Sequence, residues 1–314
     1  MVDLTWQSAT EIAASVAAGT ISARTVVDAA LERIAARDGV LNAFTDVTAD
    51  RARARAIILD AERAAGRPPG PLAGVPFAVK NLFDVADLPT RAGSAINRAR
   101  APAANDSVLV TRLERAGAVL VGALNMGEYA YDFTGENRHD GASHNPHDTT
   151  RMSGGSSGGS AVAVAGGIVP LSLGSDTNGS IRVPASLCGL FGLKPTFGRL
   201  PRTGSFPFVS SLDHLGPLAR EVGDLARAYD AMQGYDAEDP CCAQRLENPV
   251  TGVLNSGISG LRIAQASATW AGVAPCASAT SRSVRNSPSA RANVSGRKSR
   301  ARRRTMFVGR RAAS

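Results

Sequence analysis

Three short segments bring together one lysine and two serines that could do chemistry. They are Gly74–Lys80 (GVPFAVK), Gly154–Ser160 (GGSSGGS) and Gly174–Arg182 (GSDTNGSIR). A serine hydroxyl is a weak nucleophile and needs a base within hydrogen-bond reach, and a lysine can be that base without any histidine. Burial makes an amine lose its proton more readily, because desolvation disfavours the charged form. The apolar run before Lys80 therefore predicts a serine activated by a neutral lysine.

In this order and spacing, the three segments resemble the lysine strand, the Gly/Ser-rich loop and the nucleophile turn of the amidase signature family. Ser180 follows Ser156 at the separation expected in that family. The resemblance runs from about Ser8 to about Ala264. The segments NMGEYAYDFTGENRHDGASHNPHD, GSDTNGSIRVP and SFPFVSSLDHLGPLAR are most similar to the biuret and carboxybiuret hydrolase branch. A related branch is the amidase (A) subunit of Glu-tRNA(Gln) and Asp-tRNA(Asn) amidotransferases.

The resemblance implies a role for each residue of these motifs. Ser180 would attack the amide carbonyl, and Ser156, after a cis peptide bond, would relay the proton between Ser180 and Lys80. The backbone N–H groups expected to form the oxyanion hole are those of Thr177, Asn178 and Gly179. The residues expected to support the site are Ser157, Asp176 and Arg182. Asn178 stands where much of the family has glycine, which leaves its effect on the oxyanion turn open.

Other interpretations of the glycine-rich segment are weaker. Gly154, Ser156 and Gly158 also fit a nucleophile elbow, but that mechanism needs an acid and a histidine downstream, and His214 is the one histidine that follows. No Gly-Lys-Ser/Thr follows the glycines, which disfavours a phosphate-binding loop. Standing alone, the segment would indicate a flexible loop. The two accompanying segments favour amide hydrolysis instead.

The remaining metal-binding or nucleophilic residue types have ordinary interpretations. His139, His144 and His147 lie in a short polar stretch without a cysteine or carboxylate cage, which indicates a solvated loop rather than a zinc site. Cys188 has apolar neighbours and no adjacent base, as expected of a small buried hydrophobic residue. We expect no metal and no cofactor.

The segments that must position the site alternate between strand-like and helix-like patterns. The apolar run over 75–79 predicts a buried strand that ends at Lys80. Further along, a helix, a strand, a helix and a strand are predicted over 108–116, 118–123, 160–166 and 168–173. This alternation is typical of the α/β class. The resemblance implies the amidase signature fold, a mixed β-sheet core covered by helices, here incomplete at the C-terminus.

The N-terminal segment, 1–65, has the pattern of helices. Ser8 and Glu11 form a capping-box pattern, and Ser22 opens an amphipathic run over 23–36. The predicted division is an N-terminal helical scaffold (1–65), a partial amidase signature core (66–264) and a basic tail (265–314).

The positive charge is concentrated at the C-terminal end. Of the formal net charge of +8, residues 271–314 supply 11 Lys and Arg and no acid, whereas the chain before them carries 24 bases against 27 acids. A nucleic-acid footprint usually needs a basic face on a folded domain, so nucleic-acid binding is disfavoured. We expect the tail to be disordered or translated out of frame, with a genuine basic arm as the alternative. On the out-of-frame interpretation the chain is inactive.

These observations predict an amidohydrolase that cleaves a carbon–nitrogen bond of a small amide, with a biuret-like or carboxybiuret-like substrate. The first alternative is the glutaminase (A) subunit of a tRNA-dependent amidotransferase. The second, from another class, is a non-catalytic fragment whose basic tail binds nucleic acid. The resemblance also implies a homodimer or a small helical partner subunit.

The substrate-binding residues are not identified by the motifs, and the local candidates are the segments 125–138 and 205–211. The start of the chain lacks the basic-then-apolar pattern of a secretory signal. The apolar stretch 161–173 is too short and too broken by Gly and Pro to span a membrane. We therefore expect a cytoplasmic protein.

Overall fold

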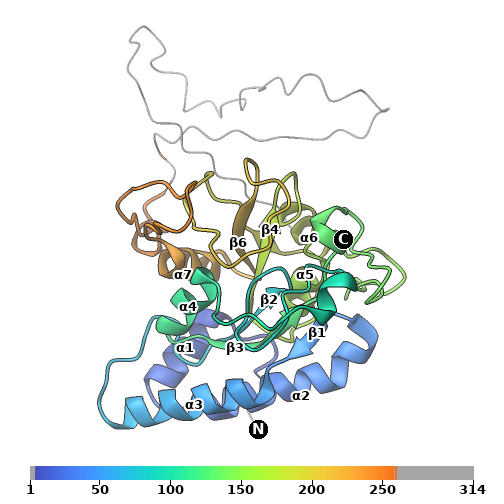
Figure 1. Cartoon of the computed structure of the whole chain (residues 1–314). Helices are drawn as coiled ribbons and strands as arrows, with labels where there is room; N and C mark the ends of the chain where they lie inside the picture. The colour runs from blue at the N-terminus through green and yellow to red at the C-terminus, as the bar shows by residue number, and fades with distance from the viewer. Residues whose placement is uncertain (1–3, 258, 260–314) are drawn as a thin grey trace, which may run out of the picture.

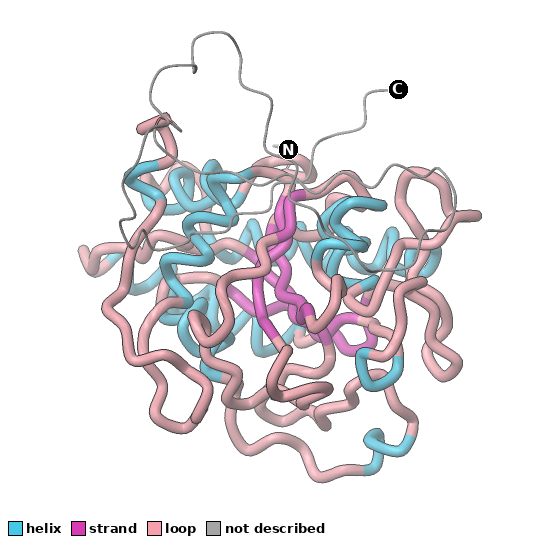
Figure 2. Tube along the Cα trace, turned by 90° about the horizontal axis from the view of Figure 1, so that it is seen from above, coloured by secondary structure: helices cyan, strands magenta, loops and turns pink. Residues whose placement is uncertain are grey.

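The computed structural model describes residues 4–257 and residue 259. A six-stranded sheet lies at its centre, with helices on both sides (Figures 1 and 2). The strand order is β1-β3-β2-β4-β6-β5, in which β2 runs parallel to β3 and β4 and the other pairs are antiparallel. The predicted α/β class with a mixed sheet is confirmed. The predicted tail, 265–314, and the last residues of the predicted core lie outside the described residues.

The strands are β1 (Phe44–Val47), β2 (Pro76–Lys80), β3 (Val119–Leu124), β4 (Leu171–Asp176), β5 (Phe191–Gly192) and β6 (His214–Ala219). The helices are α1 (Ala9–Ala17), α2 (Ala23–Leu41), α3 (Ala49–Ala64), α4 (Val108–Arg115), α5 (Gly158–Ala165), α6 (Arg182–Leu187) and α7 (Val222–Met232). Short 3₁₀ turns cover Ile96–Ala99, Glu128–Ala130 and Thr251–Val253.

Every residue of the central strands β2, β3 and β4 is buried. Strands covered on both faces have no side turned to water, which is why β2 and β3 are almost continuously apolar. Strand β4 also buries three polar residues, Ser172, Ser175 and Asp176. The predicted strand that ends at Lys80 is confirmed. Strand β4 begins at Leu171, later than the predicted start at 168, because the N–H groups of Ile168 and Val169 instead donate to the Ala163 carbonyl near the end of α5.

The predicted capping box at the first helix is confirmed. The Glu11 N–H donates to the Ser8 hydroxyl (3.1 Å), and the Ser8 N–H donates to the Glu11 carboxylate (2.8 Å). Helix α2 begins after Ser22 as predicted and continues beyond the amphipathic run, to Leu41. Helices α2 and α3 lie side by side (Figure 1).

The helical interpretation of the segment 1–65 misses one strand. Residues 44–47 form β1, an edge strand that pairs antiparallel with β3, with Phe44 opposite Leu124. The sequence FTDV is too short a pattern to predict a strand, and pairing with β3 supplies the missing preference. The N-terminal segment thus contributes to the sheet as well as to its helical cover.

Helix α5, which follows the Gly/Ser-rich loop, consists of Gly, Ala, Val and one Ser, and every residue in it is buried. A helix that is apolar all round needs cover on all sides, and α5 contacts β2, β4 and β6. Within the described part of the chain, no helix is long and apolar enough to cross a membrane.

Candidate active site

The parallel pairing of β2 and β4 brings the lysine segment next to the nucleophile segment. Phe77 lies opposite Leu171 and Val79 opposite Leu173, so both strands end at the same edge of the sheet. Lys80 is the last residue of β2, and Ser175 and Asp176 are the last two of β4. Functional groups gather at the carboxyl ends of parallel strands because the following loops diverge there.

Lys80 has no exposed surface and makes two hydrogen bonds to serine hydroxyls. Its Nζ donates to Ser156 Oγ at 2.6 Å and to Ser175 Oγ at 2.9 Å. Burial lowers the pKa of Lys80 to about 7, although the negative charges of Asp132, Asp176 and Asp213 act in the opposite direction. A substantial fraction of Lys80 is therefore neutral near pH 7 and able to accept a proton.

Ser156 lies in the loop before α5, fully buried, and its peptide bond with Gly155 is cis, as the resemblance implies. The neighbouring Ser157 ties this loop to β4. Its hydroxyl donates to the Ser175 carbonyl (3.1 Å) and accepts from the Ser175 N–H (3.3 Å), while its own N–H donates to the Ser180 carbonyl (3.3 Å). Ser157 thereby connects the Gly/Ser-rich loop to both the end of β4 and the nucleophile turn.

Asp176 is fully buried at the end of β4 and fixes the turn that carries Ser180. Its carboxylate accepts two hydrogen bonds from the Arg182 guanidinium, both of 2.9 Å, and others from the N–H groups of Gly179 (2.8 Å) and Ile181 (3.2 Å). Burial alone would raise the pKa of Asp176, but the hydrogen bonds and charge of Arg182 outweigh it and hold that pKa below the ordinary carboxyl value.

Ser180 is 4% exposed, and its hydroxyl makes no hydrogen bond to any described residue, Ser156 included. Among the described residues, no group accepts from the N–H groups of Thr177 and Asn178, whereas the Gly179 N–H donates to Asp176. Two of the three predicted oxyanion donors are therefore open, and the third is engaged. Gly179 has φ +139°, a conformation that side-chain-bearing residues rarely adopt.

The two segments proposed as substrate-binding candidates meet beside this site. The ring of Tyr131, from the segment 125–138, contacts the ring of Phe208, from the segment 205–211, with the ring centroids 5.8 Å apart. Phe133, in the first segment, lies next to the turn that carries Ser180, since a Cβ atom added to Gly179 would lie 3.5 Å from Phe133 Cε1. The second segment lines a cavity of about 320 Å³ whose wall includes Ser175 but neither Ser156 nor Ser180.

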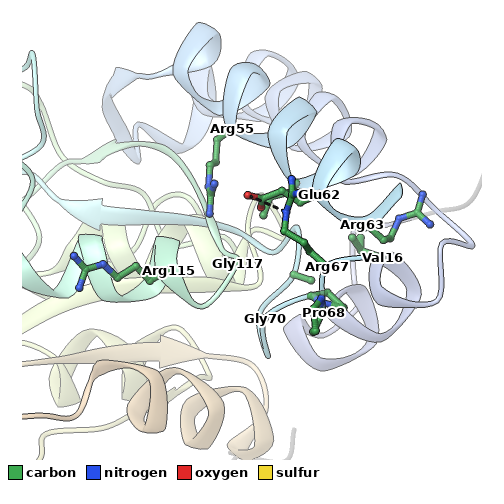
Figure 3. A pocket seen from close by; sticks show the side chains of 12 residues that line it. Val16, Arg55, Glu62, Arg63, Arg67, Pro68, Gly70, Arg115 and Gly117 are labelled. Carbon is green, nitrogen blue, oxygen red and sulfur yellow. Dashed lines mark ion pairs between the residues drawn. The ribbon is translucent and has the colours of Figure 1, made fainter. Parts of the chain in front are cut away.

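A smaller pocket, of about 100 Å³, lies away from these residues (Figure 3). Arg55 and Arg67 point toward Glu62 in it, and Arg67 Nε lies 3.8 Å from the Glu62 carboxylate. None of the predicted site residues lines this pocket.

The histidines and Cys188 take part in local contacts. His139, His144 and His147 contact three different groups, namely Glu128, the Thr149 carbonyl and the Cys188 carbonyl. Within the described residues, no cluster of His, Cys, Asp and Glu could hold a metal ion. Burial raises the pKa of Cys188 to about 12. His214 Nδ1 lies within hydrogen-bond distance of two backbone carbonyls, and among the described residues no hydrogen bond joins His214 to Ser156, as the alternative nucleophile-elbow arrangement would require.

Three residues of the site were not singled out in the sequence. Ser175 is the second hydrogen-bond partner of Lys80, and Asp132 and Asp213 act electrostatically on Lys80. Asp213 also accepts from the Thr177 hydroxyl at 2.6 Å and so holds the nucleophile turn. Ser175 lies within a predicted motif, and the parallel pairing of β2 with β4 is the signal that could have placed it beside Lys80.

Comparison with known proteins identifies the family. The sequence profile of the amidase family matches residues 25–285. The chain is 61% identical to AtzE, the 1-carboxybiuret hydrolase subunit of Pseudomonas sp. (strain ADP), over 81% of this chain and 55% of that protein. It is 50% identical to the A subunit of the glutamyl-tRNA(Gln) amidotransferase of Anaeromyxobacter dehalogenans, over 81% of this chain and 51% of that protein.

Solved structures agree. One structure from work on an s-triazine catabolic enzyme and its vestigial protein complex has 60% identity and a TM-score of 0.81, covering 82% of this chain and 56% of that one. The peptide amidase of Stenotrophomonas maltophilia has 36% identity and a TM-score of 0.78, covering 83% and 55%. The chain spans about half the length of the curated relatives it matches. With its three motifs folded around Lys80, the chain belongs to the amidase signature family.

Proposed function

We propose that this chain carries the catalytic residues of an amidohydrolase, with Ser180 as nucleophile, Ser156 as proton relay and Lys80 as base. The observation that carries the proposal is the hydrogen bond of 2.6 Å between Lys80 Nζ and Ser156 Oγ in a fully buried setting. A general base must lie within hydrogen-bond reach and have a pKa near the working pH, and Lys80 meets both conditions.

The proposed reaction begins with a neutral Lys80. Lys80 takes the hydroxyl proton of Ser156, which takes that of Ser180 as Ser180 Oγ attacks the substrate carbonyl carbon. The proton returns along the same path to the leaving nitrogen, and the carbon–nitrogen bond breaks to leave an acyl-enzyme on Ser180. Water then hydrolyses the acyl-enzyme with the same base.

The open N–H groups of Thr177 and Asn178 are suited to stabilise the oxyanion that forms in each step. One such donor typically contributes about 3 to 4 kcal/mol to a transition state. The Gly179 N–H would join them only after leaving the Asp176 carboxylate. We assign Ser157, Asp176 and Arg182 a supporting role, since they fix the loop and turn that carry the two serines.

The substrate we propose is a small ureide of the biuret or carboxybiuret type. The support is the identity of 61% to a 1-carboxybiuret hydrolase subunit, compared with 50% to the A subunit of an amidotransferase. The glutaminase function of an amidotransferase is the second candidate and rests on that second similarity. Both relatives are named as subunits, so we also propose a partner, either a small helical subunit or a second copy of the chain.

A fluorophosphonate probe tests the catalytic assignment in the full chain, because labelling needs only the nucleophile and its base. We expect labelling of Ser180, identified by peptide mass spectrometry, and none in Ser180→Ala. The rate should increase with pH around a midpoint near 7, since Lys80 must be neutral. A folded chain that shows no labelling at Ser180 contradicts the assignment.

Ammonia release then tests the substrate class. Release from biuret or 1-carboxybiuret but not from L-glutamine favours the hydrolase, and the reverse favours the glutaminase. The alternative of a nucleic-acid-binding tail concerns residues outside the described ranges. It requires salt-dependent DNA binding that is lost on deletion of residues 271–314.

A further inference from the structure

Lys80 must lose a proton to water before it can act as a base, yet none of its surface reaches solvent. Its side chain has two hydroxyl partners, Ser156 and Ser175. Ser156 is as completely buried as the lysine, whereas Ser175 is 5% exposed and forms part of the wall of the 320 Å³ cavity. Of the two partners, Ser175 is the one that lines this cavity.

This cavity is large enough for water and has polar groups in a wall that is otherwise mostly apolar. A water molecule occupies about 30 Å³ in the liquid, and a cavity holds water when polar groups are available to bind it. The wall includes the carboxylate residues Asp213, Glu238 and Asp239. It also includes Thr203, whose buried hydroxyl makes no hydrogen bond to any residue in 4–257 or 259.

The other path from Lys80 runs through Ser156 toward Ser180. The two hydroxyls of that path are not hydrogen-bonded to each other within the described structure, and Ser180 is 4% exposed. In the proposed acyl-enzyme, Ser180 Oγ carries the acyl group and has no proton to pass. A route through Ser175 is independent of the state of the nucleophile.

We propose that Ser175 carries protons between Lys80 and water in this cavity. The proposal rests on the proposed function for the role of Lys80 as a base. A proton of the charged Lys80 passes to Ser175 Oγ across 2.9 Å while the Ser175 O–H bond breaks, and that second proton joins a cavity water as hydronium. Lys80 is left neutral, Ser175 keeps one proton, and the reverse sequence recharges the lysine.

The backbone on either side favours this role. The N–H and the carbonyl of Ser175 are both engaged by the Ser157 hydroxyl, which fixes the Ser175 backbone between Lys80 and the cavity. The carboxylates that act on Lys80 come from three elements: Asp132 from the loop after β3, Asp176 from β4, and Asp213 from the residue before β6. These carboxylates remain in every Ser175 variant. Such variants therefore change the proton route from Lys80 to water more than they change the tendency of Lys80 to lose its proton.

The test is the rate at which the Lys80 ammonium protons exchange with water, measured by lysine side-chain NMR on the full chain near pH 6. Lys80, Lys194 and Lys298 are the three lysines of the sequence, so the signals are few. Ser175→Val and Ser175→Thr form a matched pair of equal shape that differs in the hydroxyl. We expect exchange at least about tenfold slower in Val than in Thr, since transfer requires hydrogen-bond reach.

A ratio below about tenfold between these two variants overturns the proposal, as does an equal slowing in Ser156→Ala, which would indicate the nucleophile path. Should the valine variant fail to fold, Ser175→Cys provides a second measurement. A small methanethiosulfonate reagent should modify that thiol in the folded chain while sparing the buried Cys188, and peptide mass spectrometry separates it from the partly exposed Cys241. Absence of modification overturns the proposal.

The failure of the proposed function would look different. In that case the fluorophosphonate leaves Ser180 unlabelled while lysine exchange still depends on Ser175. If instead Ser180 is labelled with a midpoint near pH 7 and exchange is indifferent to Ser175, the catalytic assignment stands and the proton route is wrong.

Discussion

Replacing Lys80 by methionine should make the protein more stable at neutral pH. Burial lowers the pKa of Lys80 from its ordinary value near 10.5 to about 7. At about 1.4 kcal/mol per pKa unit, this corresponds to a destabilisation of about 5 kcal/mol at pH 7. Methionine removes that term and loses two hydrogen bonds, worth about 1 kcal/mol each. The net expectation is an increase of about 3 kcal/mol in the free energy of unfolding.

The pH dependence of stability shows whether the lysine charge causes the difference between Lys80→Met and wild type. Because the pKa of Lys80 is lower in the folded state, the unfolded chain binds an extra proton between about pH 7 and 10.5, and wild-type stability increases with pH over this window. The Lys80→Met variant lacks this increase, so the difference should shrink and reach zero or reverse near pH 10. Urea unfolding followed by circular dichroism at pH 7 and pH 10 measures it, with the half-buried Lys194→Met as control. A variant less stable than wild type at pH 7, by an amount independent of pH, refutes the reasoning.

Three further variants test the site. Lys80→Arg should abolish fluorophosphonate labelling of Ser180, because a guanidinium stays protonated; labelling at the wild-type rate would exclude Lys80 as the base. Ser156→Ala should reduce the labelling rate more than Ser157→Ala, and the opposite order would mean that the relay serine is misassigned by one residue. Asp176→Asn should destabilise the fold by about 3 kcal/mol, because it removes the buried carboxylate that accepts hydrogen bonds from the Arg182 guanidinium and from the Gly179 and Ile181 N–H groups; a change under about 1 kcal/mol in urea unfolding would contradict this role of the carboxylate.

The parts of the fold that local pattern controls could be predicted. The apolar run before Lys80 became β2, and the side-chain chemistry of Ser8 and Glu11 became a capping box, because each depends on neighbours in sequence. Two later elements gave no such signal. Strand β6 contains Gly216 and Pro217, which are depleted in strands, and α7 begins after Glu221 without a side-chain cap. Their structure depends on packing against the rest of the sheet.

The residues of the site also fall into those indicated by local sequence and those placed by tertiary packing. The motifs were enough to propose Lys80, Ser156 and Ser180 as site residues, and the hydrogen bond between Lys80 and Ser156 agrees with that proposal. Ser175 could not be proposed in this way, since its contact with Lys80 depends on two strands pairing in parallel and in one register. The hydrogen bond from the Gly179 N–H to Asp176 could not be foreseen from the sequence, because a carboxylate's choice among several nearby donors depends on the folded turn.

The pairing of β2 with β4 also determines when during biosynthesis the serine could become reactive. Lys80 and Ser156 are 76 positions apart in the chain, and neither is near the other until the middle of the sheet has closed. Before that, the lysine is solvated and has its ordinary pKa near 10.5, so about one molecule in a thousand or fewer carries a neutral amine at pH 7. A nascent or partly folded chain therefore has two inert alcohols and an ammonium ion. On the proposed assignment, reactivity arises together with the native sheet, and an amide substrate cannot acylate an unfinished chain.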